Sequence, residues 1–273
     1  MTFLPLGLLG GSLLFGPIVD RFGHKALLLL SCLVVLLGLE GIAFFTSIPL
    51  LQVSIIGIGL GGGILNGETN ALVADISNEA EKGSRLSLLG AFYGIGALGI
   101  PVLLSFLSEY YSFEIILQGT GMVMLIGILF CLGIRFPAPK QPQGFPIKEG
   151  LGLLKESSLL LLSFILFFQS GIEGVCNNWT TLYLGQTTGI PENRALIALT
   201  CMVAGLTVAR LLLVVLFKKI KQETVLRTSL ITAVAGFALL TFAPGFARAA
   251  IGMALIGAGL ASTFPVILSI IGS

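Results

Sequence analysis

Apolar runs of about 20 residues recur along the whole of this chain, and they decide what it can fold into. An α-helix needs about 20 apolar residues to cross the hydrocarbon core of a bilayer. Nine stretches reach this length. They are residues 2–19, 26–46, 50–74, 86–108, 113–134, 157–186, 195–217, 225–243 and 246–272. Because the runs recur, they are not one signal peptide ahead of a soluble domain.

The composition excludes a water-soluble globular fold. Hydrophobic residues make up 55% of the 273 residues and charged residues 10%, whereas a soluble domain is roughly a quarter charged. Barrel strands would alternate over about ten residues, but these runs are continuously apolar, and a helix satisfies its backbone hydrogen bonds within one segment. We therefore expect an all-α membrane protein, a polytopic helical bundle of about nine transmembrane helices in the lipid bilayer.

Positive charge is distributed unevenly between the loops. Of the 15 Lys and Arg residues, twelve lie in alternate loops or beside them, Arg194 and Arg248 lie in the other loops, and Arg210 lies inside a span. Cytoplasmic loops carry the Lys and Arg excess. We therefore expect the Ser273 end to be cytoplasmic and the membrane to be the plasma membrane, in bacteria the inner membrane. Charges that stand singly between spans do not make a nucleic-acid site, so no nucleic-acid partner is expected.

One segment, FPAPKQPQGFPIKEGLGLLKE (residues 136–156), interrupts the apolar pattern with four prolines and several charges. Proline at this spacing disfavours helix, so the segment is predicted to be a cytoplasmic linker. It divides an N-terminal half with five spans (residues 1–135) from a C-terminal half with four (residues 157–273). GGSLLFGPIVDRFGHKALLLLS and VARLLLVVLFKKIKQETVLRTS are weakly alike, and internal repeats are typical of secondary transporters.

The stretch GPIVDRFGHK (residues 16–25) joins the first two spans. It contains four ionisable residues, Asp20, Arg21, His24 and Lys25. It resembles the loop motif G-x-x-x-D-[R/K]-x-G-[R/K]-[R/K] of the major facilitator superfamily. The matching residues are Gly16, Asp20, Arg21, Gly23 and Lys25. His24 stands where a basic residue is usual, and Gly23 permits a tight turn. The resemblance implies a major-facilitator-like fold in which this gating loop latches two helical halves in one conformation.

Other stretches resemble the fucose:proton symporter branch of that family. GLGGGILNGETNALVADIS, SGIEGVCNNWTTLYL and FPVILS are similar to its fourth, seventh and tenth helices. The resemblance implies proton-coupled uptake of a small sugar by alternating access, with a sugar and a proton as partners. It covers the second to the tenth helices, so we expect a fragment, an incomplete twelve-helix fold. A monomer is expected.

Two acidic residues inside the spans, Glu68 and Glu173, are the candidates for proton coupling. Acids within membrane spans are costly and usually functional, and burial favours their protonated form. The alternative is a structural pair for Glu68, with Arg210 as one candidate partner. The substrate-binding candidates are Asn66, Asn70, Gln169, Asn177, Asn178, Trp179 and Arg210.

Polar groups beside aromatic rings suit a sugar, whose C–H face stacks while its hydroxyls form hydrogen bonds. For Trp179 the alternative is an interfacial aromatic belt. Two alternatives for the whole chain stay open. GAFYGIGALGIP resembles the glycine–proline motif of drug antiporters, and the chain could be a non-transporting fragment or accessory membrane protein. It contains no nucleophile–base pair and no metal-ligand cluster, so neither an enzyme nor a cofactor is expected.

Overall fold

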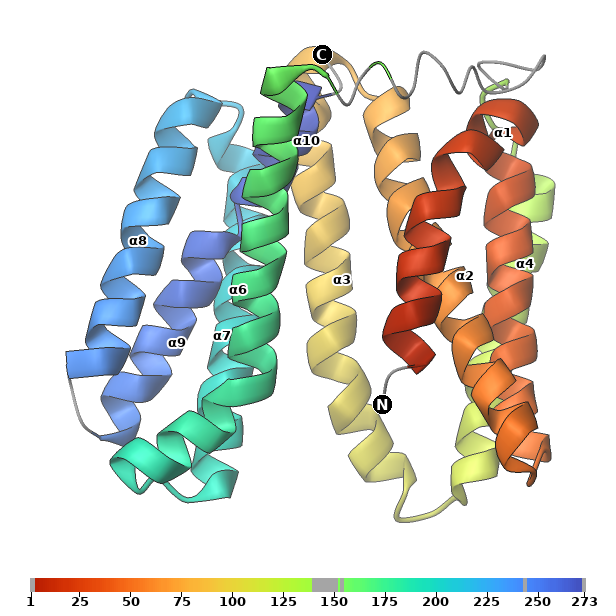
Figure 1. Cartoon of the computed structure of the whole chain (residues 1–273), viewed down its shortest axis with the longest axis horizontal. Coiled ribbons are helices and arrows are strands. Elements are labelled where there is room, and N and C mark those ends of the chain that lie inside the picture. Colours follow the sequence, from red (N-terminus) through yellow and green to blue (C-terminus); the bar gives the residue numbers. More distant parts are fainter. Residues whose placement is uncertain (1–2, 139–151, 153–154, 243–244, 272–273) are drawn as a thin grey trace. The chain divides into compact units, whose positions relative to one another are not determined.

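The computed structural model describes residues 3–138, 152, 155–242 and 245–271, which are helical apart from short connections (Figure 1). Most of the expected linker 136–156, and Ser273, lie outside the described residues. Within the described ranges, eight helices are long and apolar enough to cross a membrane. They contain all nine predicted spans, because the first helix, α1 (Phe3–Phe44), combines two of them. The chain is therefore a multi-pass integral membrane protein.

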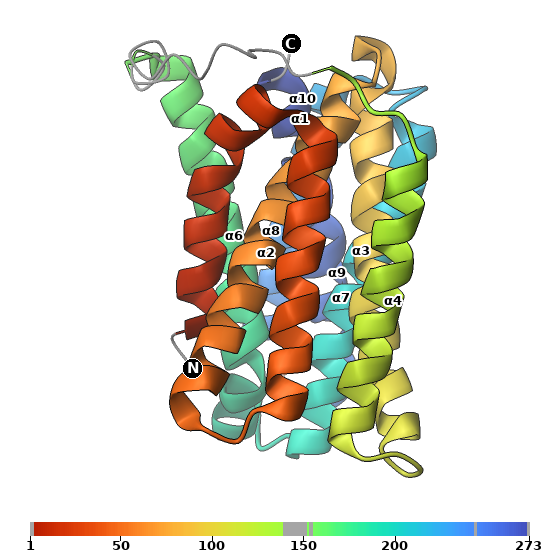
Figure 2. The same cartoon turned by 90° about the vertical axis from the view of Figure 1, so that its right-hand side faces the viewer.

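Helix α1 is 42 residues long, but it is broken at Gly23, which has φ 80° and ψ 165°. This left-handed conformation suits glycine because glycine has no Cβ. Figure 2 shows the two arms of α1 running side by side after the chain reverses direction. The turn is shorter than the predicted loop 20–25, since Asp20, Arg21 and Lys25 all have helical geometry.

The chain splits into two compact units. The first contains residues 1–72 and 102–151, and therefore α1, most of α2 (Ile48–Asp75), the end of α3 (Glu79–Leu107) and α4 (Phe113–Gly133). The second contains residues 73–101 and 152–273, and thus most of α3 with α6 to α10. The division at the linker into 1–135 and 157–273 stays a prediction about the sequence halves.

Glycines let α2 pack closely against both arms of α1. Gly11 of the first arm lies on the backbone of Leu60, and Gly61 of α2 lies on the second arm, where an added Cβ would be 2.7 Å from the Ser31 carbonyl oxygen. Small residues at such contacts let helix backbones approach in a membrane. The glycine run of α2, including Gly59 and Gly61, is therefore a packing seam.

Neighbouring glycines of α1 give a matched test of this seam. A Cβ on Gly11 would be 2.9 Å from the Ile64 backbone nitrogen, whereas a Cβ on Gly10 meets nothing within 4 Å. We expect Gly11→Ala to destabilise the protein by about 1–3 kcal/mol, the usual range for overpacking. Gly10→Ala should be neutral or slightly stabilising, because Ala is the better helix former. Thermal unfolding of both variants in detergent checks this; equal melting temperatures would contradict the seam.

The core of the second unit forms around α9 (Phe246–Leu260). This helix packs against α7 (Glu192–Leu216) and α8 (Gln222–Phe242). Glycines again make the contacts close, as where Gly205 of α7 meets the backbone of Ala254. Helix α6 (Ser157–Thr188) adds Cys176 and Leu184 to a buried cluster with Met202 and Met253.

The last predicted span, 246–272, is not one uninterrupted helix. It is broken at residues 261–262, between α9 and α10 (Thr263–Ile271). Pro265 explains the break, because proline has no N–H to donate to the carbonyl of residue 261 and its ring crowds that carbonyl. Together the two helices still form one stretch long enough to cross a membrane, Phe246–Ile270.

Candidate functional site

A buried acid–imidazole pair lies between α1 and α2 in the first unit. His24 Nδ1 and Glu68 Oε1 are 2.8 Å apart, and the two residues are 5% and 0% exposed. If the imidazole nitrogen is protonated, it donates to the carboxylate; if the carboxyl is protonated, it donates to the nitrogen. In both cases a proton lies between the groups, which makes the pair chemically able to hold and release one.

The local fold explains how these two residues meet. His24 directly follows the break at Gly23, at the start of the second arm of α1. Glu68 lies on the buried side of α2, near Gly67, where an added Cβ would be 2.6 Å from the ring of Phe15. Sequence reasoning identified Glu68 but missed its partner. The available signal was that His24 is the only histidine of the chain.

Asn66 and Asn70 lie on one face of α2, as their four-residue spacing predicts. Asn70 Nδ2 donates to the backbone oxygen of Asn66 at 2.7 Å. Asn66 is exposed, whereas Glu68 is buried, so the two lie on different sides of the helix. The asparagines are thus separate from the His24–Glu68 pair, and their role in substrate binding stays a prediction.

Residues of the gating loop make contacts inside the first unit. Lys25 Nζ donates to the carbonyl oxygens of Leu132 at 2.7 Å and Ile134 at 3.0 Å, at the C-terminal end of α4. Arg21 lies over the ring of Phe22, 5.2 Å from its centroid, and Asp20 is half-buried. Lys25 therefore connects α1 to α4, and the role of Gly16, Asp20, Arg21, Gly23 and Lys25 as a latch stays a prediction.

Lys25 therefore acts as a C-terminal cap for α4. Cations near a helix C-terminus are typically worth about 0.3–1 kcal/mol, and hydrogen bonds from a charged donor about 1.5–3 kcal/mol. We expect Lys25→Met to lower the stability of the protein by about 1 kcal/mol, because the exposed setting weakens both effects. Thermal unfolding in detergent checks this. Lys155→Met, which removes an exposed lysine outside this contact, is the control; an equal effect of both changes would contradict the cap.

A second buried polar group lies in the second unit, around Arg210 of α7. Arg210 is 8% exposed, and its Nη1 donates to the backbone oxygen of Gly90 on α3 at 3.1 Å. The arginine side chain lies directly against this glycine, because an added Cβ on Gly90 would be 2.9 Å from Arg210 Cδ. The predicted residue Arg210 is thus buried and bonded to α3, whereas the predicted residue Glu173 of α6 is partly buried.

Gln169 lies one turn before Glu173 on α6 and is buried. Its Oε1 accepts no hydrogen bond from the described part of the chain. A buried polar atom without a partner is costly, so this oxygen is available to a ligand or a water molecule. Gln169 and Glu173 share one face of α6, as their four-residue spacing predicts.

The other candidates on α6 either bond to their own helix or are exposed. Asn177 Nδ2 and Asn178 Nδ2 donate to backbone oxygens of their own helix, at 3.0 Å to Glu173 and 2.7 Å to Gly174. Trp179 is 59% exposed. Exposure of this kind in a membrane helix is compatible with both the aromatic belt and a sugar platform, and these three roles stay predictions. No set of three or more His, Cys, Asp or Glu side chains within the described ranges is placed to hold a metal ion.

Comparison of the sequence with known proteins identifies the family of the chain. A model of the Major Facilitator Superfamily matches residues 1–273, so the chain is a member of it. Members of this family are transporters, and the protein is accordingly a membrane transporter-family protein and not an enzyme.

Sequence relatives are distant. The uncharacterized MFS-type transporter YfkL of Bacillus subtilis (strain 168) is 26% identical over 214 residues, which cover 75% of this chain and 53% of YfkL. The multidrug resistance protein MdtH of Aeromonas hydrophila is 30% identical over 168 residues, 61% of this chain and 41% of MdtH. The chain thus spans about half the length of these relatives.

Solved structures show the same fold. The E. coli fucose:proton symporter FucP matches with a TM-score of 0.78 at 20% identity, over 97% of this chain and 72% of FucP. The proton:xylose symporter XylE matches with a TM-score of 0.71 at 18% identity, over 99% of this chain and 70% of XylE. At these identities the likeness concerns the fold alone.

Proposed function

We propose that this protein takes up a small sugar together with a proton, by alternating access of two helical halves. The observation that carries the proposal is the buried His24–Glu68 pair, which can hold a proton between α1 and α2. An acid in this setting is a functional candidate by default. Glu173 of α6 is the second proton-coupling candidate.

Two buried polar residues of the second unit, Arg210 of α7 and Gln169 of α6, are the proposed substrate-binding groups. A guanidinium and an amide with a free oxygen can orient hydroxyl groups, because they supply donors and an acceptor. Further candidates for contact with a sugar are Asn66 and Asn70 in the first unit and Asn177, Asn178 and Trp179 in the second. The two solved structures named above are described as sugar symporters, which supports this substrate class.

Uptake under an imposed proton gradient tests the proposal. The protein is reconstituted in proteoliposomes, and a panel of labelled hexoses and pentoses is offered from outside, with the outside acidic. We expect one or a few sugars to accumulate and a protonophore to abolish the accumulation. Absence of accumulation for the whole panel would contradict the proposal.

A second candidate function is drug efflux. It is favoured by the likeness to MdtH, which is named as a multidrug resistance protein. A lipophilic cation offered in the same proteoliposomes separates the two functions. Proton-driven movement of the cation, without sugar uptake, would favour efflux.

The charge distribution supports a further part of the proposal. Because the Lys and Arg excess marks cytoplasmic loops, we infer that the Ser273 end faces the cytoplasm and that the protein lies in the plasma membrane as a monomer. Segments 1–135 and 157–273 would then be the two moving halves, joined by the linker 136–156.

A further inference from the structure

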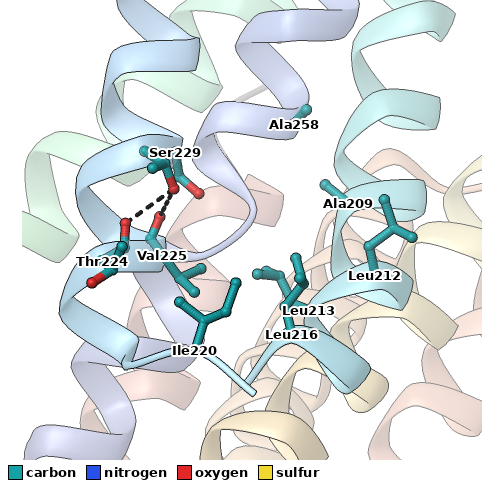
Figure 3. A pocket seen from close by; sticks show the side chains of 10 residues that line it. Ala209, Leu212, Leu213, Leu216, Ile220, Thr224, Val225, Ser229 and Ala258 are labelled. Carbon is teal, nitrogen blue, oxygen red and sulfur yellow. Dashed lines mark hydrogen bonds between the residues drawn. The ribbon is translucent and has the colours of Figure 1, made fainter. Parts of the chain in front are cut away.

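A pocket that neither polar group uses lies among α7, α8 and α9 of the second unit (Figure 3). Its volume is about 180 Å³, and it is lined by α7, α8 and Ala258 of α9. The apolar lining is Ala209, Leu212, Leu213, Leu216, Ile220 and Val225. Pockets for drug-sized molecules measure roughly 300–1,000 Å³, so this pocket suits part of a flexible chain rather than a whole substrate.

Basic residues surround the turn at which α7 passes into α8. Lys218 and Lys219 stand between the lining residues Leu216 and Ile220, and Lys221 follows directly; all three lysines are exposed. Arg227, also exposed, precedes the lining residue Thr228. Residues 217–229 include four basic residues and one acidic residue, Glu223. The chain therefore places a strong positive charge beside this pocket, which is a groove with an apolar lining.

The hydroxyl residues of the pocket lie on the first turns of α8, next to the lysines. They are Thr224, Thr228 and Ser229. Thr228 donates its hydroxyl to backbone oxygens of Thr224 and Val225, at 3.0 Å and 2.9 Å, and its oxygen can still accept a hydrogen bond. Polarity thus increases from the groove toward the basic turn, as it does along a lipid from acyl chain to head group.

We propose that this groove binds one anionic phospholipid, with an acyl chain along α7 and α8 and the phosphate head group at the lysines of the turn. The charge complementarity selects the occupant, because clusters of Lys and Arg beside membrane helices attract anionic lipids. Zwitterionic lipids have no net charge to match four cations. The groove has no ionisable lining residue, which separates it from the proton and substrate groups.

Native mass spectrometry of the purified protein tests the site. Phosphatidylglycerol and phosphatidylcholine with the same acyl chains are titrated separately. We expect one phosphatidylglycerol to bind about tenfold more tightly than phosphatidylcholine. The double variant Lys218→Gln/Lys219→Gln should lose this preference. The control Arg135→Gln/Lys155→Gln, which removes two exposed charges elsewhere, should keep it.

The groove itself is tested with a matched pair on α8. Thr228→Phe fills the pocket, whereas Thr241→Phe changes an exposed threonine with the same hydrogen bond to its own helix, 2.9 Å to the Phe237 oxygen. We expect only Thr228→Phe to weaken phosphatidylglycerol binding, about tenfold. Equal binding of both lipids would mean an ordinary surrounding lipid and overturn the proposal, as would equal effects of the two variants. If Thr228→Phe fails to fold, the exposed lysine variants decide.

Discussion

Replacing Glu68 with Gln is expected to abolish sugar-driven proton entry. Glutamine has the shape of Glu and can still form a hydrogen bond with His24, 2.8 Å away in the native protein, but it cannot bind and release a proton. The change therefore removes the chemistry and keeps the packing. We expect coupled uptake in proteoliposomes to fall at least tenfold, while exchange of labelled for unlabelled sugar without a proton gradient persists.

Glu40 provides the matched control for this experiment. It is a partly buried acid of α1 in the same unit, beside Gly121 of α4. Glu40→Gln should leave coupled uptake within about twofold of the native protein, since surface and half-buried substitutions away from key contacts have small effects. If Glu68→Gln keeps full coupling, the proton is carried elsewhere, and Glu173 becomes the first alternative.

Replacing Arg210 with Ala is expected to lower the rate of sugar uptake at least tenfold. The change deletes a buried guanidinium that donates to the Gly90 carbonyl oxygen. Without the guanidinium, the proposed substrate site loses its charged hydrogen-bond donor. Arg210→Lys should retain part of the activity, because it keeps the charge but not the planar donor geometry.

A loss of folding must be separated from this loss of binding. Arg194→Ala on the same helix removes an exposed arginine, 5.8 Å from the ring centroid of Phe246, and should transport normally. Arg210→Lys should unfold in detergent near the native temperature while its apparent KM for sugar rises. A variant with unchanged KM and a lower melting temperature would assign Arg210 to structure alone.

The helices were predictable because membrane spans are defined by length and apolarity, which are local properties. Gly23 also marked the turn between the first two spans correctly. The break between α9 and α10 was missed, although Pro265 signals it, because the apolar run continues through it. The assignment of Val73–Pro101 to the C-terminal unit depends on distant packing, for which the sequence shows no local signal.

The candidate sites were predictable only in part. Helical spacing was enough to place Asn66 with Asn70 and Gln169 with Glu173. The pairing of His24 with Glu68 was not, because the residues are 44 positions apart and meet only when the glycines of α2 allow close approach to α1. Likewise, the contact of Arg210 with Gly90 joins residues 120 positions apart.

The most direct test of the central claim, proton coupling to sugar, records the pH inside proteoliposomes with a trapped dye. A sugar gradient is imposed inward at equal pH on both sides. The account predicts that the interior acidifies when the transported sugar is added, and that Glu68→Gln abolishes the acidification. No pH change with any sugar, together with proton exit driven by a lipophilic cation, would contradict sugar symport and favour efflux.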